Sequence, residues 1–241
     1  TWETNVRGTY ILLEAIRETT NKFLAIITAS SDKAYGEYPI EELPYREHYP
    51  LKPKYPYDTS KACADLITQT YSTELFEMPI VITRFANIYG PGQLNFSALI
   101  PDAIRCCLGY DKFLSRGDGN STRDFLFVDD VVELYAIIAE GLCKDPKKIR
   151  GEIFNAGTGD ERKVRDIIEA IYLKVDRKKE YNDILKLFTK NENPFTEIKS
   201  QLMHYDKVKD FFGWEPKTDF ELGLDLTIEW YRKYLKDTMV K

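Results

Sequence analysis

Two short runs rich in apolar and β-branched residues constrain the fold of this chain most. Residues 23–29 read FLAIITA and residues 80–85 read IVITRF, and both runs are too short for buried helices. A strand that is apolar along its whole length is covered on both faces, as in a parallel sheet flanked by helices. Because helical patterns separate the runs, the chain is predicted to be an α/β protein with a doubly wound parallel sheet.

The remaining pattern places further elements along the chain. Gly90, Pro91 and Gly92 predict a loop over residues 86–96, and Ser97 is expected to cap the helix that follows. The charged, weakly patterned stretch 177–199 is predicted to be a flexible or inserted segment. Helices are expected over residues 1–17, 57–76, 97–108, 129–143, 163–175 and 220–236, and additional short strands over 112–115, 125–128 and 152–155.

Composition excludes several classes of function. The 241 residues include 34 Lys and Arg against 39 Asp and Glu, with the two signs interspersed, so no basic face for nucleic acid is expected. No apolar run reaches the ~20 residues that cross a bilayer, and the first thirty residues lack a leader pattern, which predicts a cytoplasmic protein. The four cysteines match neither metal-ligand spacing nor a disulfide framework, so we expect reduced thiols and no metal site.

One pair of residues suggests chemistry. Tyr57 and Lys61 stand four apart on a predicted helix, so their side chains project from the same face. A phenol is a poor base at neutral pH, and a neighbouring ammonium lowers its pKa by favouring the phenolate. A solvated helix face is the commoner meaning of this spacing. However, Ser30–Lys33 follows a predicted strand, at the edge where parallel sheets bind ligands, although an ordinary turn is the alternative there.

Six ordered stretches of the sequence resemble the extended short-chain dehydrogenase/reductases, and within them the nucleotide-sugar epimerases and dehydratases. The resemblance covers nearly the whole chain, and six blocks at suitable separations are more specific than any one of them. The matching stretches are NVRGTYILLEA (5–15), SSDKAYG (30–36), YPYDTSKACAD (55–65), RFANIYGPGQ (84–93), RDFLFVDDVV (123–132) and FNAGTG (154–159).

This resemblance implies NAD as cofactor and a nucleotide-diphosphate sugar as substrate. It implies that Tyr57 takes the proton of the sugar 4-hydroxyl while hydride leaves C4 for NAD. Lys61 is then its partner, bonded to the nicotinamide ribose, and Ser31 orients the 4-oxygen. Arg84 is placed with Tyr57 and Lys61 on the cofactor side.

Other positions of the resemblance concern the substrate diphosphate. Asn87 and the loop to Gln93, together with Asn95, resemble the segment that holds it, and Arg123 resembles a phosphate-binding arginine. A guanidinium suits this role because it offers several charge-assisted donors. A surface ion pair between Arg123 and a neighbouring aspartate is the alternative.

Asp32 and Lys33 separate activities within the family. Epimerases commonly have small or apolar residues after the serine, whereas the triplet Ser-Asp-Lys most resembles CDP-glucose 4,6-dehydratases. The resemblance implies Asp32 as the acid toward the 6-hydroxyl and Lys33 as a participant in proton transfer at C5. A lysine acts as a base only if burial or a nearby cation lowers its pKa. A 4-epimerase, or an inactive remnant that serves as a binding or assembly module, remains as an alternative.

The glycine-rich turn with which this family holds the NAD pyrophosphate is missing. No G-x-G-x-x-G occurs in residues 1–241, and the alignable part begins after the family's fourth strand, so roughly three βα units of about 30 residues are absent. Residues 1–85, with about 125–157, are expected to form the C-terminal half of a Rossmann domain, and 86–124 with 158–241 a substrate-binding lobe. Helices 1–17 and 57–76 are expected to pair with a second copy as a homodimer.

We expect residues 1–241 alone to bind NAD weakly or not at all, because the pyrophosphate would lack its backbone amides and helix amino end. Isothermal titration calorimetry of NAD into the purified chain checks this expectation. Binding with a micromolar Kd would contradict it.

Overall fold

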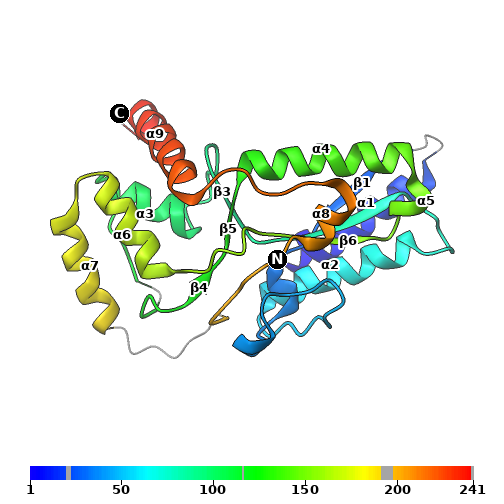
Figure 1. Cartoon of the computed structure of the whole chain (residues 1–241), viewed down its shortest axis with the longest axis horizontal. Helices are drawn as coiled ribbons and strands as arrows, with labels where there is room; N and C mark the ends of the chain where they lie inside the picture. The colour runs from blue at the N-terminus through cyan, green and yellow to red at the C-terminus, as the bar shows by residue number, and fades with distance from the viewer. Residues whose placement is uncertain (20–22, 116, 191–197, 240–241) are drawn as a thin grey trace.

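Three parallel strands form the sheet at the centre of the fold (Figure 1). The computed structural model describes residues 1–19, 23–115, 117–190 and 198–239. The strand order is β1-β2-β6, with Ile26 opposite Ile80 and Ile82 opposite Ile153. The predicted α/β class with a parallel sheet is therefore confirmed. The strands are β1 (Ile26–Ala29), β2 (Ile80–Phe85) and β6 (Ile153–Ala156).

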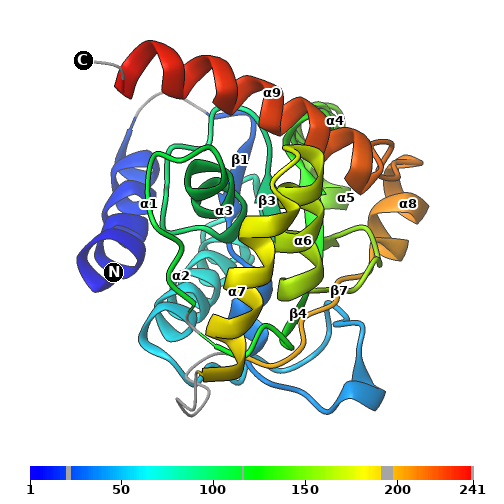
Figure 2. The ribbon, with the colours of Figure 1, turned by 90° about the vertical axis from the view of Figure 1, so that its left-hand side faces the viewer.

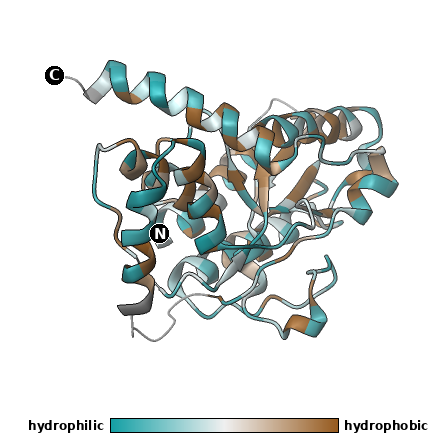
Figure 3. Ribbon diagram, turned by 60° about the vertical axis from the view of Figure 1, so that its left-hand side comes forward, coloured by the Kyte–Doolittle hydropathy of each residue, from teal (hydrophilic) through white to brown (hydrophobic). Residues whose placement is uncertain are grey.

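Helices cover both faces of this sheet, as the continuous apolar strands require. Ile80 packs with Leu13 and with the partly buried Ile26 on the side of the first two helices, whereas the neighbouring Val81 joins the cluster on the opposite side. Brown, hydrophobic ribbon accordingly concentrates on the strands and on the inner sides of the helices (Figure 3). The first side carries η1 (Trp2–Arg7), α1 (Gly8–Glu18) and α2 (Pro56–Ser72), and the second carries α4 (Val128–Lys144), α5 (Pro146–Ile149) and α8 (Asp206–Phe212).

A group of helices beside the sheet forms a second core (Figure 2). Tyr181, Ile184 and Phe188 are buried in this core, so the expectation that residues 177–199 are a flexible or inserted segment is wrong for the helix 178–190. Residues 191–197 lie outside the described residues. The helices are α3 (Leu99–Cys107), α6 (Val164–Lys174), α7 (Lys178–Lys190) and α9 (Phe220–Met239), and they pack against β3 (Asn87–Tyr89) and β5 (Phe125–Phe127).

Several local predictions need correction. Ser97 does not cap α3, because the helix begins two residues later and Ala98 is its N-cap residue. The backbone amide of Ser97 donates to Oδ1 of Asn95 at 3.0 Å. The predicted strand 112–115 is irregular, and the predicted loop 86–96 contains β3, which pairs with β5. The remaining elements are β4 (Thr122–Arg123), paired with β7 (Arg162–Lys163), and the 3-10 helices η2 (Asp32–Tyr35) and η3 (Ile40–Glu42).

The structure bears on two expectations from composition, one about membrane-spanning helices and one about the cysteines. No helix among the described residues is both long and apolar enough to cross a bilayer. The four cysteines are free, and burial raises the pKa of the Cys106 thiol to about 12 and that of Cys107 to about 11. The thiolate is the reactive form of cysteine, so these two thiols are unreactive at neutral pH.

A buried ion pair joins α2 to the sheet. The Arg84 guanidinium, on β2, donates to both carboxylate oxygens of Asp65, on α2, at 2.8 and 2.9 Å, and both side chains are at most 2% exposed. Arg84 also donates to the Tyr35 hydroxyl, which in turn donates to Asn155 on β6. The network therefore fixes the helix, two strands and the segment after β1 relative to one another.

Asp65→Asn is expected to lower the free energy of unfolding by about 3 kcal/mol, because it leaves the buried Arg84 charge without its partner. Urea unfolding followed by circular dichroism measures the change. Glu3→Gln breaks an exposed ion pair with Arg7 and serves as the control, with an expected change below about 0.5 kcal/mol. Equal effects of the two substitutions would contradict this account.

Candidate active site

A cavity of about 550 Å³ opens at the carboxyl ends of β1 and β2, between the sheet and the helices of the second core. This is the place where open parallel sheets bind ligands. Nine of the ten residues singled out from the sequence line it, and Arg84 is the exception. The nine are Ser31, Asp32, Lys33, Tyr57, Lys61, Asn87, Gln93, Asn95 and Arg123.

Arg84 does not line the cavity, so the structure gives no support to its expected cofactor contact. Its guanidinium is 2% exposed and is engaged by Asp65 and Tyr35 inside the core. A buried, doubly paired arginine has no donor to offer a ligand on the other side of β2. Its role in this structure is to hold the elements that carry the site.

The segment after β1 turns its polar side chains into the cavity because it folds as a single 3-10 turn. Ser31 caps this turn, accepting from the Lys33 amide at 3.3 Å, and its hydroxyl donates to Oδ1 of Asp32 at 2.8 Å. Asp32 is only 2% exposed, and burial raises the pKa of its carboxyl. Its Oδ2 has no hydrogen-bond partner within the described part of the chain. Asp32 is thus suited to keep a proton and donate it.

Tyr57 and Lys61 lie on the face of α2 that borders the cavity, as their spacing predicts. The Lys61 ammonium donates to the carbonyl of Ala29, at the end of β1, at 3.0 Å. Burial raises the pKa of the Tyr57 phenol, with Asp32 and Asp58 adding to the shift, and burial lowers the pKa of Lys61. The prediction that Lys61 lowers the pKa of Tyr57 is therefore not met in this structure, in which the ammonium is directed to a backbone carbonyl.

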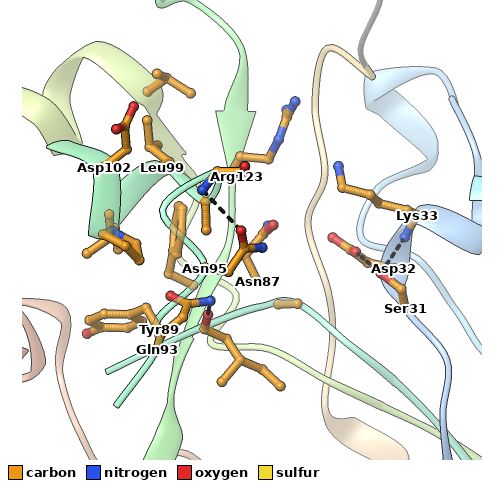
Figure 4. A pocket seen from close by; sticks show the side chains of 18 of the residues that line it. Ser31, Asp32, Lys33, Asn87, Tyr89, Gln93, Asn95, Leu99, Asp102 and Arg123 are labelled. Atoms are coloured by element: carbon orange, nitrogen blue, oxygen red, sulfur yellow. Dashed lines mark hydrogen bonds between the residues drawn. The ribbon is translucent and has the colours of Figure 1, made fainter. Parts of the chain in front are cut away.

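The opposite wall carries amide side chains and one guanidinium beside Tyr89, Leu99 and Asp102 (Figure 4). Asn87 donates to the carbonyl of Asp124 at 3.2 Å, and Gln93 donates to the carbonyl of Ile88 at 3.3 Å. Arg123 is buried at the end of β4 and donates to the carbonyl oxygens of Thr122 at 2.7 Å and of the distant Lys199 at 3.3 Å. This wall offers several donors across the cavity from Asp32 and Lys33.

Two residues near the site were missed from the sequence. Asp124 directly follows Arg123, is fully buried, and accepts from the amides of Thr158, Gly159 and Met203, so it anchors the strand that carries Arg123. Its place beside Arg123 in a conspicuous Arg-Asp-Phe stretch could have drawn attention to it. Gln201 contacts Lys33 from 168 positions away, and no local sequence signal marks it.

The donors present fit one end of NAD. Tyr57 and Lys61 both line the cavity at the sheet edge, and the buried hydroxyl of Ser30 has no partner among the residues described. Such groups suit the hydroxyls of a ribose and the amide of a nicotinamide ring. The pyrophosphate end lacks its glycine-rich turn in residues 1–241. The described residues contain no cluster of His, Cys, Asp and Glu that could hold a metal ion.

Comparison with known proteins agrees with this geometry. Over 237 residues the chain is 33% identical to the human protein named dTDP-D-glucose 4,6-dehydratase, covering 95% of this chain and 62% of the relative. A dTDP-glucose 4,6-dehydratase from Bacillus anthracis, solved in complex with NAD, is 30% identical with a TM-score of 0.81, covering 98% of this chain and 69% of that one. A double mutant of the Streptomyces venezuelae enzyme, solved with NAD bound, is 25% identical with a TM-score of 0.79, covering 97% and 67%.

The chain thus spans less than two thirds of the length of the human relative. The family model described as GDP-mannose 4,6 dehydratase matches residues 1–227, which is nearly the whole chain. On that match, together with the parallel sheet and the residues at its carboxyl edge, the chain belongs to the GDP-mannose 4,6 dehydratase family of nucleotide-sugar enzymes.

Proposed function

We propose that the complete native protein is an NAD-dependent nucleotide-sugar 4,6-dehydratase that converts an NDP-hexose to its 4-keto-6-deoxy derivative. The observation that carries the proposal is the buried Asp32, next to Lys33, in the same cavity as Tyr57 and Lys61. An epimerase needs only to oxidise and reduce at C4. A dehydratase must also remove water across C5 and C6, which requires an acid and a base at the same sugar.

The first step uses the residues at the sheet edge. NAD, when bound, accepts the hydride from C4. Tyr57 takes the proton of the 4-hydroxyl, and Ser31 holds the 4-oxygen. The Lys61 ammonium favours the phenolate once it turns from the Ala29 carbonyl toward the ribose and the phenol, since an opposite charge close to an acid stabilises its ionised form.

The second step uses the neighbouring pair. Oxidation at C4 makes the hydrogen on C5 acidic, and the neutral amine of Lys33 takes that proton as the C5–C6 double bond forms. The C6–O bond breaks at the same time, and Asp32 gives its proton to the departing hydroxyl, which leaves as water. The raised pKa of Asp32 supports this role because the acid must still hold its proton near neutral pH. Lys33 then returns its proton to C5 as C6 takes up a hydride, which bound NAD would supply.

The wall opposite Asp32 is proposed to hold the substrate diphosphate. Arg123 contributes the positive charge, and Asn87, Gln93 and Asn95 contribute amide groups. The Ser31-Asp32-Lys33 triplet favours a CDP-hexose, whereas the relatives described above are named for dTDP-glucose. A panel of CDP-, dTDP-, UDP- and GDP-hexoses distinguishes these substrates.

The proposal also assigns the cofactor and the substrate to different parts of the chain. Residues 1–85 with 125–157 would hold the nicotinamide end of the cofactor, and 86–124 with 158–241 would hold the nucleotide-sugar. A homodimer through α1 and α2 is supported by the apolar residues that these helices expose. Among them are Ile11, Leu12 (61% exposed) and Leu66.

Asp32→Asn is expected to lower the rate of 4-keto-6-deoxy product formation by at least about 100-fold, because elimination loses its acid. Oxidation at C4 should remain, so reduced NAD should accumulate and be visible by its absorbance. The native protein of full natural length is used, with NMR of the product. Asp237→Asn, at an exposed position, is the matched control. A product with inverted C4 and an intact 6-hydroxyl, or no turnover of any NDP-hexose, would overturn the dehydratase proposal.

Asp32→Asn should also stabilise the fold, and more so at higher pH. Burial raises the pKa of Asp32 above its unfolded value, so the stability contributed by the protonated form is present at low pH and is lost as pH rises through the folded pKa. The asparagine stays neutral and avoids this loss. The gain in Tm over wild type should therefore be larger at pH 8 than at pH 4.5, whereas Asp237→Asn should show no such trend. A gain that is larger at low pH would contradict the assignment.

A further inference from the structure

The side chain of Lys33 has one partner that comes from a distant part of the chain. Its Nζ donates to Oε1 of Gln201 at 3.1 Å. Gln201 is completely buried, and its Nε2 has no hydrogen-bond partner among the described residues. Lysine is a donor only, so the amide must present its oxygen to Nζ. The contact is thus between an amine and an uncharged acceptor.

The backbone around Gln201 holds this acceptor in place. Residues 199–203, here called the strap, pass between Lys33 and Arg123 (Figure 4). Hydrogen bonds hold the backbone of the strap on both sides. On the side of Arg123 they join it to β4 and to Asp124, and on the side of η2 they join it to the segment near residue 45. These bonds are Thr122 N to Lys199 O at 2.8 Å, Gln201 N to Thr122 O at 3.2 Å, Met203 N to Asp124 Oδ2 at 3.3 Å and Tyr45 N to Leu202 O at 2.9 Å.

We infer that Gln201 is a positioning residue for Lys33: its fixed amide oxygen aims the lysine amine into the cavity without forming an ion pair. This inference rests on the proposed function, in which Lys33 takes the C5 proton. A base must be neutral when it accepts a proton, and a neutral amine still donates one hydrogen to Gln201 while its lone pair faces the sugar. A carboxylate at the same point would instead hold the lysine in its ammonium form.

Replacing Gln201 by glutamate changes the charge next to Lys33 with almost no change of shape. The other titratable and charged groups around this end of the cavity are Asp32, Tyr45, Tyr57, Lys61 and Arg123. They stay unchanged when Gln201 is replaced by the isosteric glutamate. Any shift in the protonation of Lys33 in that variant therefore reports the contact with residue 201.

The first test measures Lys33 directly, in protein without substrate. Acetic anhydride labels only neutral amines, so mass spectrometry of the Lys33 peptide gives the pH of half-maximal labelling. Gln201→Glu should raise this pH by about one unit or more, the effect of an adjacent opposite charge. Asn182→Asp makes the same neutral-to-acid change on the exposed face of α7 and should leave it unmoved. An unchanged labelling pH in folded Gln201→Glu would overturn the inference.

The second test measures turnover in the native protein. Gln201→Glu should move the acid limb of the pH profile of kcat upward by the same amount as the labelling pH. Gln201→Asn withdraws the carbonyl by one methylene without adding charge, so kcat should fall about tenfold with KM changed less than twofold and the limb in place. If Gln201→Glu does not fold, Gln201→Asn alone still tests the positioning role. A loss confined to KM, or wild-type kcat in folded Gln201→Asn, would contradict the positioning role.

The two tests separate the two levels of the argument. If no NDP-hexose is turned over by wild type, the proposed function fails, while the labelling shift still decides whether Gln201 controls Lys33. If turnover is normal and labelling does not shift, the dehydratase proposal stands and the role of Gln201 is rejected.

Discussion

The ion pair between Asp65 and Arg84 is the interaction on which the site geometry depends. It is buried on both sides and joins α2, which carries Tyr57 and Lys61, to β2. Through Tyr35 it also holds the turn that carries Asp32 and Lys33. A salt bridge of this kind adds little to stability relative to an apolar pair of similar shape, but its directional bonds fix elements in register. Two pairs of residues from separate segments, both predicted to be catalytic, are thereby brought to one cavity.

Asp124 and Asp32 are two buried carboxyls near the cavity that differ in their hydrogen-bond partners. Asp124 accepts several backbone amides, and all of its acceptor capacity serves to hold the loop after β6 and the strap. Asp32 accepts from the Ser31 hydroxyl and lies near the positive charges of Lys33 and Arg123. Burial raises the pKa of both carboxyls. Only Asp32, however, has a carboxylate oxygen, Oδ2, without a hydrogen-bond partner among the described residues.

The elements that depend on local pattern could be predicted from the sequence, and those that depend on distant contacts could not. The strands around Ile27 and Ile82, and the helix that carries Tyr57 and Lys61, follow from apolar patterning and spacing. The helix 178–190 was missed because most of its residues are charged or polar, and the core that covers its buried face, with Tyr181 and Phe188, is built from other segments. Arg84 was assigned to the cofactor for a related reason: nothing near it in the sequence shows that Asp65 lies opposite.

The same distinction explains why the candidate site was found only in part. Eight of its residues lie in short stretches whose order along the chain carries the family resemblance, and Asn95 follows one of these stretches closely, so each could be named before its neighbours in space were known. Gln201 carries no such signal, since a lone glutamine in a charged segment is ordinary in a soluble helix or loop. Its relation to Lys33 exists only because backbone hydrogen bonds hold the strap between β4 and the segment that follows η2. A residue proposed to position a base can therefore be distant from it in the chain, and the substitution most informative about the proposed mechanism lies outside every recognisable motif.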